Sequence, residues 1–282
     1  MPDASSAGPD NTPADRLGTA RLLQAHGIRP DRDFGQNFLL DENLVDLAVR
    51  LGEVGPDDVV LEVGPGVGTL TTALARAARH VHALEIDRRL EPPLRESLEG
   101  VSNVTLHWGD AMRMDLGALD PVPTRLVANL PYSIATPLVM ESLWTLPRCD
   151  RWAVMVQREV ADRWTAPVGS SLYGAPSVLL ALTVRQTALR PVPPTVFMPR
   201  PRVDSAIVAL ERVAPAPDDG LRRMVQAAFA QRRKTLANSL RTGGWDRESV
   251  AGALERIGRK PSARAQELRP DEFASLAEAL RA

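Results

Sequence analysis

The fold of this 282-residue chain is decided by the stretch Glu62-Val63-Gly64-Pro65-Gly66-Val67-Gly68-Thr69. It follows a short apolar run, has a glycine at every second position from 64 to 68 and leads into a helix-like segment at 69–78. Glycine adopts backbone angles that other residues avoid, and it lets a ligand approach the main chain closely. The spacing therefore predicts a turn from a buried strand into a helix. The turn could have only a structural role, but we favour one that binds a nucleotide-like ligand.

The same alternation of a short apolar run and a helix-like segment continues to residue 157. Near-continuous apolar runs of this length are typical of central strands covered on both faces. The expected strands are 59–63, 81–86, 104–108, 126–129 and 152–156, and the expected helices between them are 69–78, 88–99 and 136–146. This order predicts a doubly wound, mostly parallel α/β sheet.

The pattern changes after Tyr173. Two β-rich stretches, 177–187 and 203–211, predict further strands of the sheet, separated by a proline-dense loop at 191–201. Residues 213–220 break all periodicity and are expected to be a linker.

The remainder has helical spacing, with expected helices at 221–231, 233–241, 247–257 and 270–281. We therefore expect one domain at 19–212 and a small helical domain at 213–282. Residues 1–18 are rich in Ala, Ser, Pro and Asp and are expected to be a disordered tail.

Composition excludes several classes of protein. The single cysteine, Cys149, cannot form an internal disulfide, and no apolar stretch approaches the roughly 18 residues of a membrane span. The four histidines show no metal-ligand spacing, and the chain has neither a G-x-S-x-G elbow nor a Walker loop. We expect a cytoplasmic, monomeric protein with no metal and no membrane contact.

Two acidic residues indicate which nucleotide-like ligand the loop binds. Glu85 ends the second expected strand, where a carboxylate can accept hydrogen bonds from both hydroxyls of a ribose, and Asp110 follows the third, where it could accept from an adenine amine. Singly, Glu85 could be a solvated strand end and Asp110 a helix N-cap. With the glycine loop they favour S-adenosylmethionine. Thr69 stands where a dinucleotide-binding motif would have Gly or Ala, which weakens the alternative of an NAD-dependent oxidoreductase.

The fourth expected strand ends in Asn129-Leu130-Pro131-Tyr132, which indicates the class of reaction. A base amine is a poor nucleophile because its lone pair is delocalised into the ring. The Asn129 side-chain oxygen and a carbonyl freed by the interruption at Pro131 can each accept one amine hydrogen, while Tyr132 stacks on the base. An ordinary Asn-Pro turn is the alternative, but its place after the glycine loop favours N-methylation of adenine or cytosine, achieved mainly by alignment and desolvation.

The chain resembles the KsgA-type ribosomal RNA adenine N6,N6-dimethyltransferases from about residue 22 to 269. The similarity is carried by Gly35-Gln36-Asn37-Phe38-Leu39, Gly64-Pro65-Gly66, the tetrapeptide at 129–132, the segment 197–205, and Gln231-Arg232-Arg233-Lys234-Thr235 with Asn238-Ser239-Leu240. It implies a Rossmann-like class I methyltransferase that dimethylates two neighbouring adenosines near the 3′ end of small-subunit ribosomal RNA in a pre-ribosomal particle.

The resemblance also implies roles for single residues. Asn37 and Leu39 would contact the methionine part of the cofactor, Gly64 and Gly66 would form its backbone cradle, and Glu85 and Asp110 would keep the roles given above. Asn129 would lie at the edge shared by the two substrates, binding the cofactor as well as the target amine. Phe197 would stack on the flipped target base opposite Tyr132. The alternatives are that Phe197 packs on the core and that Asn37 is a loop residue ahead of a helix capped by Asp41.

The helical domain is the expected RNA contact. Residues 211–282 contain 14 Lys and Arg against 10 Asp and Glu, a local net charge of +4 in a chain whose total is −1. Arg232, Arg233 and Lys234 concentrate this excess at an expected helix start. A solvated charged face is the alternative.

Two rival functions share the expected scaffold. One is a large-subunit ribosomal RNA methyltransferase of the macrolide-resistance type, whose tetrapeptide usually has Ile in place of Leu130. The other is a non-catalytic RNA-binding or transcription-factor module. The segment 231–240 argues against the first, and the intact tetrapeptide argues against the second.

Overall fold

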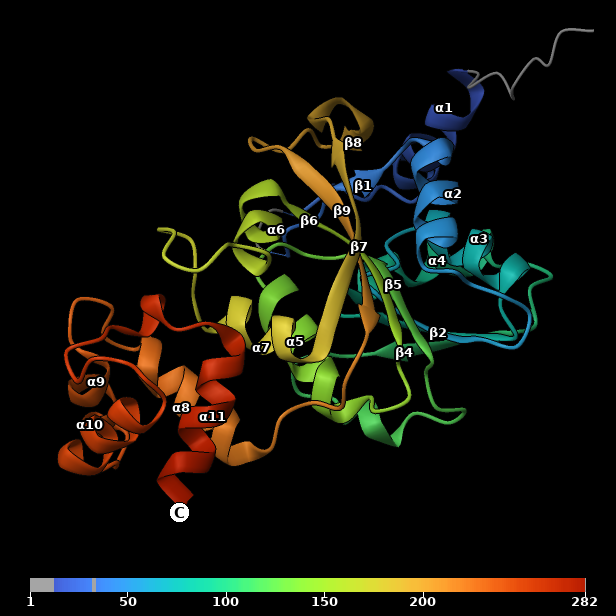
Figure 1. Cartoon of the computed structure of the whole chain (residues 1–282). Coiled ribbons are helices and arrows are strands. Elements are labelled where there is room, and N and C mark those ends of the chain that lie inside the picture. The colour runs from blue at the N-terminus through green and yellow to red at the C-terminus, as the bar shows by residue number, and fades with distance from the viewer. Residues whose placement is uncertain (1–12, 32–33, 282) are drawn as a thin grey trace, which may run out of the picture.

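The computed structural model describes residues 13–31 and 34–281. Its centre is a seven-stranded sheet with the order β4-β3-β2-β5-β6-β9-β7 (Figure 1). The strands are β2 (Val59–Val63), β3 (His80–Glu85), β4 (Val104–Trp108), β5 (Arg125–Asn129), β6 (Arg151–Gln157), β7 (Val184–Val192) and β9 (Ser205–Arg212). Strands β2 to β6 are parallel, whereas β9 is antiparallel to β6 and β7 is antiparallel to β9. The expected doubly wound α/β sheet is confirmed.

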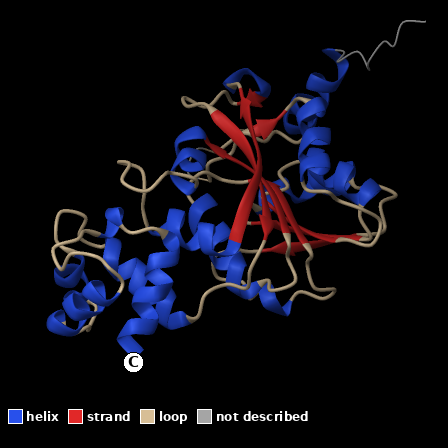
Figure 2. Ribbon diagram, viewed as in Figure 1, coloured by secondary structure: helices blue, strands red, loops and turns tan. Residues whose placement is uncertain are grey.

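Helices cover both faces of this sheet (Figure 2). One face packs against α5 (Ala135–Thr145) and α6 (Arg158–Trp164), and the other against α2 (Glu42–Leu51) and α3 (Thr69–Ala77). The remaining helical elements of this part are η1 (Arg88–Leu90), α4 (Glu91–Ser97), η2 (Leu116–Ala118) and η3 (Pro194–Val196). Strand residues alternate between the two clusters, since successive side chains of a strand point to opposite faces.

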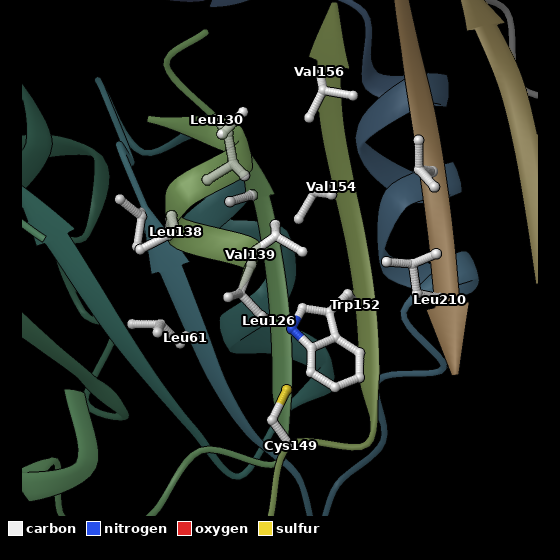
Figure 3. Packing of buried hydrophobic residues seen from close by; sticks show 14 of the residues in the cluster. Leu61, Leu126, Leu130, Leu138, Val139, Cys149, Trp152, Val154, Val156 and Leu210 are labelled. Atoms are coloured by element: carbon white, nitrogen blue, oxygen red, sulfur yellow. The ribbon is translucent and has the colours of Figure 1, made fainter. Parts of the chain in front are cut away.

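The cluster on the α5 face is the main core. Figure 3 shows Leu126, Leu138 and Trp152 meeting there, with Cys149 at one end of the cluster. The indole Nε1 of Trp152 donates to Ser142 Oγ at 2.8 Å, so its polar atom is paired inside the core. Burial raises the pKa of the Cys149 thiol to about 12, which keeps it un-ionised and chemically quiet.

Two expectations for the strands were wrong. Strand β4 matches the expected 104–108 but lies at the edge of the sheet, with Val104 to Trp108 only partly covered. Residues 177–183, expected to be strand, belong to helix α7 (Ala175–Thr183), and β7 starts only at Val184. The Leu and Ala residues of this run are good helix formers, and Ser177 Oγ accepts from the N–H of Gly174 at the helix start (3.0 Å).

The proline-dense segment is also more ordered than a loop. Strand β7 extends through Pro191 to Val192, and β8 (Phe197–Met198) pairs antiparallel with β1 (Phe38–Leu39). This pairing joins the beginning of the chain to a segment about 160 residues later, which no local pattern reveals.

The prediction of a disordered tail at 1–18 is wrong for residues 13–18. Residues 1–12 lie outside the described residues, but helix α1 begins at Pro13 and runs to Ala25. Leu23 is buried with Phe38 and Val67, and Thr19 Oγ1 lies 3.2 Å from Thr69 Oγ1. Contacts with the glycine loop region thus stabilise a helix whose own composition did not predict it.

The C-terminal helices pack together and onto α7. They are α8 (Asp219–Phe229), α9 (Leu236–Thr242), α10 (Arg247–Arg256) and α11 (Pro270–Arg281), with η4 (Ala265–Glu267) between the last two. Their hydrophobic cluster also contains Tyr173 and Val178, and the Tyr173 hydroxyl donates to the Leu268 carbonyl at 3.0 Å. Some residues before the linker therefore share the core of the helical part, and the domain division at 212/213 stays a prediction.

No helix among residues 13–31 and 34–281 is long and apolar enough to cross a membrane.

Arg212, at the end of β9, holds the end of α5 against the sheet. Its Nε donates to the Cys149 carbonyl (2.8 Å), and its Nη2 donates to the carbonyls of Leu143 and Leu146 (3.2 Å each). The guanidinium also lies 5.1 Å from the ring centroid of Trp152. One side chain thus satisfies carbonyls that the end of a helix leaves without partners.

We expect Arg212→Met to lower the free energy of unfolding by about 2–4 kcal/mol, because the substitution removes the hydrogen bonds to three carbonyls, of which only that of Leu146 keeps a second donor among the described residues, the N–H of Cys149. Urea denaturation followed by circular dichroism measures the loss. The control is Arg185→Met, which removes an exposed ion pair with Glu211 and should change stability by about 1 kcal/mol or less. Equal effects of the two substitutions would contradict the role given to Arg212.

Candidate functional site

A pocket opens where the strands β2, β3, β4 and β5 end. Its lining comes from five separate segments of the chain, at 34–39, 62–67, 84–86, 109–111 and 129–134, together with Thr69, Leu70 and Leu90. Ten of the residues expected at the site line it: Asn37, Leu39, Gly64, Gly66, Glu85, Asp110, Asn129, Leu130, Pro131 and Tyr132. The expected Phe197 is not among the lining residues.

The glycine loop forms the floor of the pocket. Gly64, Gly66 and Gly68 have φ angles of 76°, 62° and 91°, a region that strongly favours glycine. A Cβ on Gly66 would lie 3.0 Å from two ring carbons of Phe38, so the close approach of the two segments also requires glycine there. At Gly64 and Gly66 the loop thus presents main chain to the pocket, between the lining residues Pro65 and Val67.

Glu85 is fixed by backbone donors. Its Oε1 accepts from the N–H groups of Ile86 and Asp87 (2.9 Å each), and its Oε2 accepts from the N–H of Gly66 (3.2 Å). The residue is 5% exposed, and burial raises its pKa although the backbone hydrogen bonds act in the opposite direction. The result is a rigid carboxyl group at the pocket wall, joined directly to the glycine loop.

Asp110 lies in the turn after β4. Its Oδ1 accepts from the N–H of Met112 at 2.8 Å, and its Oδ2 lies 3.6 Å from Nε of Arg113. The next residues form a turn and not an α-helix, so Asp110 stabilises a turn and does not cap a helix. Its side chain is 37% exposed, which leaves it accessible from the pocket.

The tetrapeptide 129–132 follows β5 directly. Asn129 Nδ2 donates to the carbonyl of Asn37 at 2.9 Å. Because that carbonyl can only accept, this bond directs the amide nitrogen to it and leaves Oδ1 as the acceptor that the side chain can offer to another molecule. Beyond the end of β5, no hydrogen bond of the described residues reaches the Leu130 carbonyl.

Tyr132 completes the tetrapeptide. Its hydroxyl lies 2.7 Å from Ser205 Oγ, at the start of β9, which fixes the ring. Burial raises the pKa of the phenol, so the hydroxyl stays protonated at neutral pH.

The structure places Asn37 between two fixed segments. Its Nδ2 donates to the Gly35 carbonyl at 3.0 Å, and the next two residues form β1. Asp41 does cap α2, with Oδ1 accepting from the N–H of Leu44 at 3.3 Å, but this does not remove Asn37 from the pocket.

Phe197 lies in the hydrophobic core and not in the lining of the pocket. It pairs with Leu39 across the β1–β8 ladder, is 4% exposed, and packs with Val196 and Ile207 in the core on the α2 face. Its burial matches the alternative of a core-packing residue, and its stacking on a base stays a prediction.

The three basic residues expected to bind RNA lie in the turn between α8 and α9 and not at a helix start, because α9 begins at Leu236. Arg232 donates to the carbonyls of Tyr173 (2.6 Å) and Ser171 (3.0 Å). Arg233 and Lys234 are exposed. Arg232 therefore joins the helical part to the segment before α7, and it is exposed like its two neighbours.

Three histidines lie close together on β3 and β4, and their ring nitrogens form hydrogen bonds with one another and with neighbouring groups. His82 Nδ1 lies 3.0 Å from His107 Nε2, His82 Nε2 lies 2.8 Å from the Pro121 carbonyl, and His80 Nε2 lies 3.1 Å from Thr105 Oγ1. No group of three or more His, Cys, Asp or Glu side chains in the described part of the chain could hold a metal ion.

Sequence reasoning missed Glu62 as a site residue. It is 1% exposed and lines the pocket, and within the described part of the chain its Oε2 has no hydrogen-bond partner. Burial raises its pKa to about 8. The signal was present in the sequence, since an acidic residue in the otherwise apolar run 59–63 requires an explanation.

We expect Glu62→Gln to become more stable relative to the unsubstituted protein as the pH rises from about 5 to 8. With the pKa raised from 4.5 to about 8, the folded state keeps a proton that the unfolded state has lost, so the unsubstituted protein loses stability across this range. Melting temperatures of both proteins at pH 5, 6.5 and 8 test this. A difference that does not change with pH would show that Glu62 titrates normally.

Comparison with known proteins identifies the family. The family described as ribosomal RNA adenine dimethylase matches residues 28–282. The Ribosomal RNA small subunit methyltransferase A of Rubrobacter xylanophilus is 49% identical over 257 residues, which cover 90% of this chain and 96% of that protein. The protein of the same name from Thermobifida fusca is 43% identical over 277 residues, covering 95% of each chain.

Two solved structures are similar to this chain over most of its length. A dimethyladenosine transferase from Plasmodium falciparum superposes with a TM-score of 0.71 at 25% identity, over 85% of this chain and 95% of that one. The 23S rRNA methyltransferase ErmE superposes with a TM-score of 0.66 at 30% identity, over 87% of this chain and 100% of that one. Since the match spans the pocket, the sheet and the C-terminal helices, the chain belongs to the ribosomal RNA adenine dimethylase family.

Proposed function

We propose that this protein transfers methyl groups from S-adenosylmethionine to N6 of two adjacent adenosines near the 3′ end of small-subunit ribosomal RNA, within a pre-ribosomal particle. The observation that carries the proposal is the fixed amide of Asn129, whose nitrogen is bound to the Asn37 carbonyl at the edge of the pocket. The cytoplasmic location and the monomeric state expected from the sequence stay predictions.

The pocket fits the proposed cofactor. The buried carboxyl of Glu85 supports ribose recognition, the side-chain-free loop at Gly64 and Gly66 supports close approach of a ligand, and Asp110 supports recognition of an adenine amine. The unpaired Oε2 of Glu62 fits the cofactor's ammonium group, which would supply the missing donor. When bound, S-adenosylmethionine supplies an electrophilic methyl group on a sulfonium.

The protein's contribution to transfer is alignment. Asn129 Oδ1 and the Leu130 carbonyl accept the two hydrogens of the target amine, which draws its lone pair out of conjugation with the ring. Tyr132 supports the base with a ring fixed by Ser205. The amine proton becomes acidic only once the nitrogen carries the new methyl group, so no strong base is required beforehand. Stacking by Phe197 would require its ring to leave the core cluster.

Choice of RNA must come from surfaces outside the pocket, because the pocket holds one base. Arg232, Arg233 and Lys234 are all exposed and are proposed to contact phosphates, and Arg232 also donates to the carbonyls of Tyr173 and Ser171. The small-subunit assignment is supported by relatives 39–49% identical to this chain that carry the small-subunit name, whereas ErmE is 30% identical.

We expect Asn129→Ala to reduce the rate of methyl transfer and Glu85→Ala to reduce the affinity for the cofactor. Asn129→Ala should slow single-turnover methyl transfer by about a hundredfold or more with cofactor affinity within a few-fold, because one oriented acceptor is lost. Glu85→Ala should weaken cofactor binding by roughly 2–3 kcal/mol. Calorimetry and rapid-quench kinetics separate the two effects. A near-normal transfer rate for Asn129→Ala would rule out its proposed role.

The choice of substrate is tested with cofactor carrying a labelled methyl group. We expect label to enter unmodified small ribosomal subunits, with up to two methyl groups on each of two adenosines, and mass spectrometry of nuclease digests to show N6,N6-dimethyladenosine. Large-subunit RNA should remain nearly unlabelled. Label on one adenosine of protein-free large-subunit RNA would replace the small-subunit assignment, and cofactor binding without transfer to any RNA would favour a non-catalytic role.

A further inference from the structure

Asp87 is a buried anchor just beyond Glu85. Its side chain is 3% exposed and is not part of the pocket lining. Gln36 Nε2 donates to Oδ2 (2.7 Å), and Arg89 donates to Oδ1 through its backbone N–H (3.0 Å) and Nε (2.9 Å) and to Oδ2 through Nη2 (2.8 Å). Burial by itself raises the pKa of Asp87, but the hydrogen bonds from Arg89 and Gln36 outweigh it and hold the pKa below its usual value. Asp87 therefore stays charged and fixed.

Gln36 is the side chain that this anchor holds. Its Oε1 accepts from the N–H of Asp31 (2.8 Å) while its Nε2 donates to Asp87, so the amide is bonded at both ends. The backbone N–H of Gln36 also donates to the Asp31 carbonyl (3.2 Å). A side chain bonded in this way restricts the main chain of its own residue.

The next carbonyl along the chain is the one that orients Asn129. Asn37 follows Gln36 directly, and its carbonyl accepts from Asn129 Nδ2 at 2.9 Å. On the other side of Asn37, strand β1 is paired with β8. The position of this carbonyl is thus determined from two directions, by the anchor at Gln36 and by the strand pair.

We propose that Gln36 and Asp87 are positioning residues that hold the Asn37 carbonyl so that Asn129 presents its oxygen, and not its NH2 group, to the target amine. The inference rests on the proposed role of Asn129 in methyl transfer. The oxygen and the NH2 group of a carboxamide have nearly the same shape. An Asn129 amide that loses the Asn37 carbonyl as its acceptor can therefore rotate by a half turn and exchange the positions of these two groups. It would then place hydrogens against a group whose own hydrogens need acceptors.

The first test is a double-mutant cycle. Gln36→Met keeps the length of the side chain and removes both of its hydrogen bonds. We expect it to slow single-turnover transfer about tenfold at saturating cofactor and RNA, in the range found for residues that orient a functional side chain. In an Asn129→Ala background the same substitution should have little further effect, because the group it acts through is absent. The matched control is Gln24→Met, an exposed glutamine of α1, which should leave the rate unchanged.

The second test needs neither RNA nor cofactor. In ¹⁵N-labelled protein, the Asn129 side-chain NH2 signals are assigned by their loss in Asn129→Ala. Their hydrogen exchange should be about tenfold faster in Gln36→Met, since opening of the Asn37 bond becomes more frequent, and unchanged in Gln24→Met. If the unsubstituted protein methylated no RNA, the proposed function would fail while this measurement still reported on the positioning.

A second variant changes the charge at the same position. Gln36→Glu keeps the shape of the side chain but sets a carboxylate against Asp87, and it should reduce transfer at least as much as Gln36→Met. The proposal is overturned by equal losses with and without Asn129, by unaltered exchange of the Asn129 amide, or by a loss confined to cofactor affinity. The last result would show that the anchor acts through Glu85, whose Oε1 accepts from the N–H of Asp87.

Discussion

Strand β2 is hydrogen-bonded to β3 on one side and to β5 on the other. The order of the strands along the sheet therefore reverses at β2, and the position of the pocket depends on this reversal. In a parallel sheet the chain leaves neighbouring strands in opposite directions at such a point, which opens a crevice above their carboxyl ends. The glycine loop after β2, Glu85 at the end of β3 and the tetrapeptide after β5 all meet at this crevice. The pocket is therefore a consequence of strand order.

The pocket is held together by bonds between segments far apart in the sequence. The Gly66 N–H bonds to Glu85, and Asn129 bonds to the Asn37 carbonyl. Each of these bonds links a group that faces the ligand to a backbone group of another loop. Each bond thus fixes the position of one pocket group relative to a second loop.

The C-terminal helices are joined to the sheet by packing and by a few directed hydrogen bonds. Tyr173 and Val178 enter the helical cluster from the sequence before the linker, Arg232 reaches back to carbonyls at 171 and 173, and Trp144 Nε1 donates to the Pro217 carbonyl (2.8 Å). These interactions place the basic turn, in which Arg233 and Lys234 are exposed. This arrangement supports, without testing, the proposal that the turn contacts RNA.

The sequence by itself determined the strands at 59–63 and 104–108, the doubly wound order and eight of the pocket residues, because apolar runs, glycine spacing and strand ends are local features, whereas Asn37 and Leu39 were expected only from the family resemblance. Tertiary structure alone decided that 177–183 is helical, that Phe197 is buried, that Arg232 bonds to carbonyls and that Glu62 Oε2 has no hydrogen-bond partner among the described residues. The physical reason is the same in each case. Burial and hydrogen bonding depend on which distant segment packs against a residue, and in this chain those partners, such as β1 for β8, lie up to about 160 positions away.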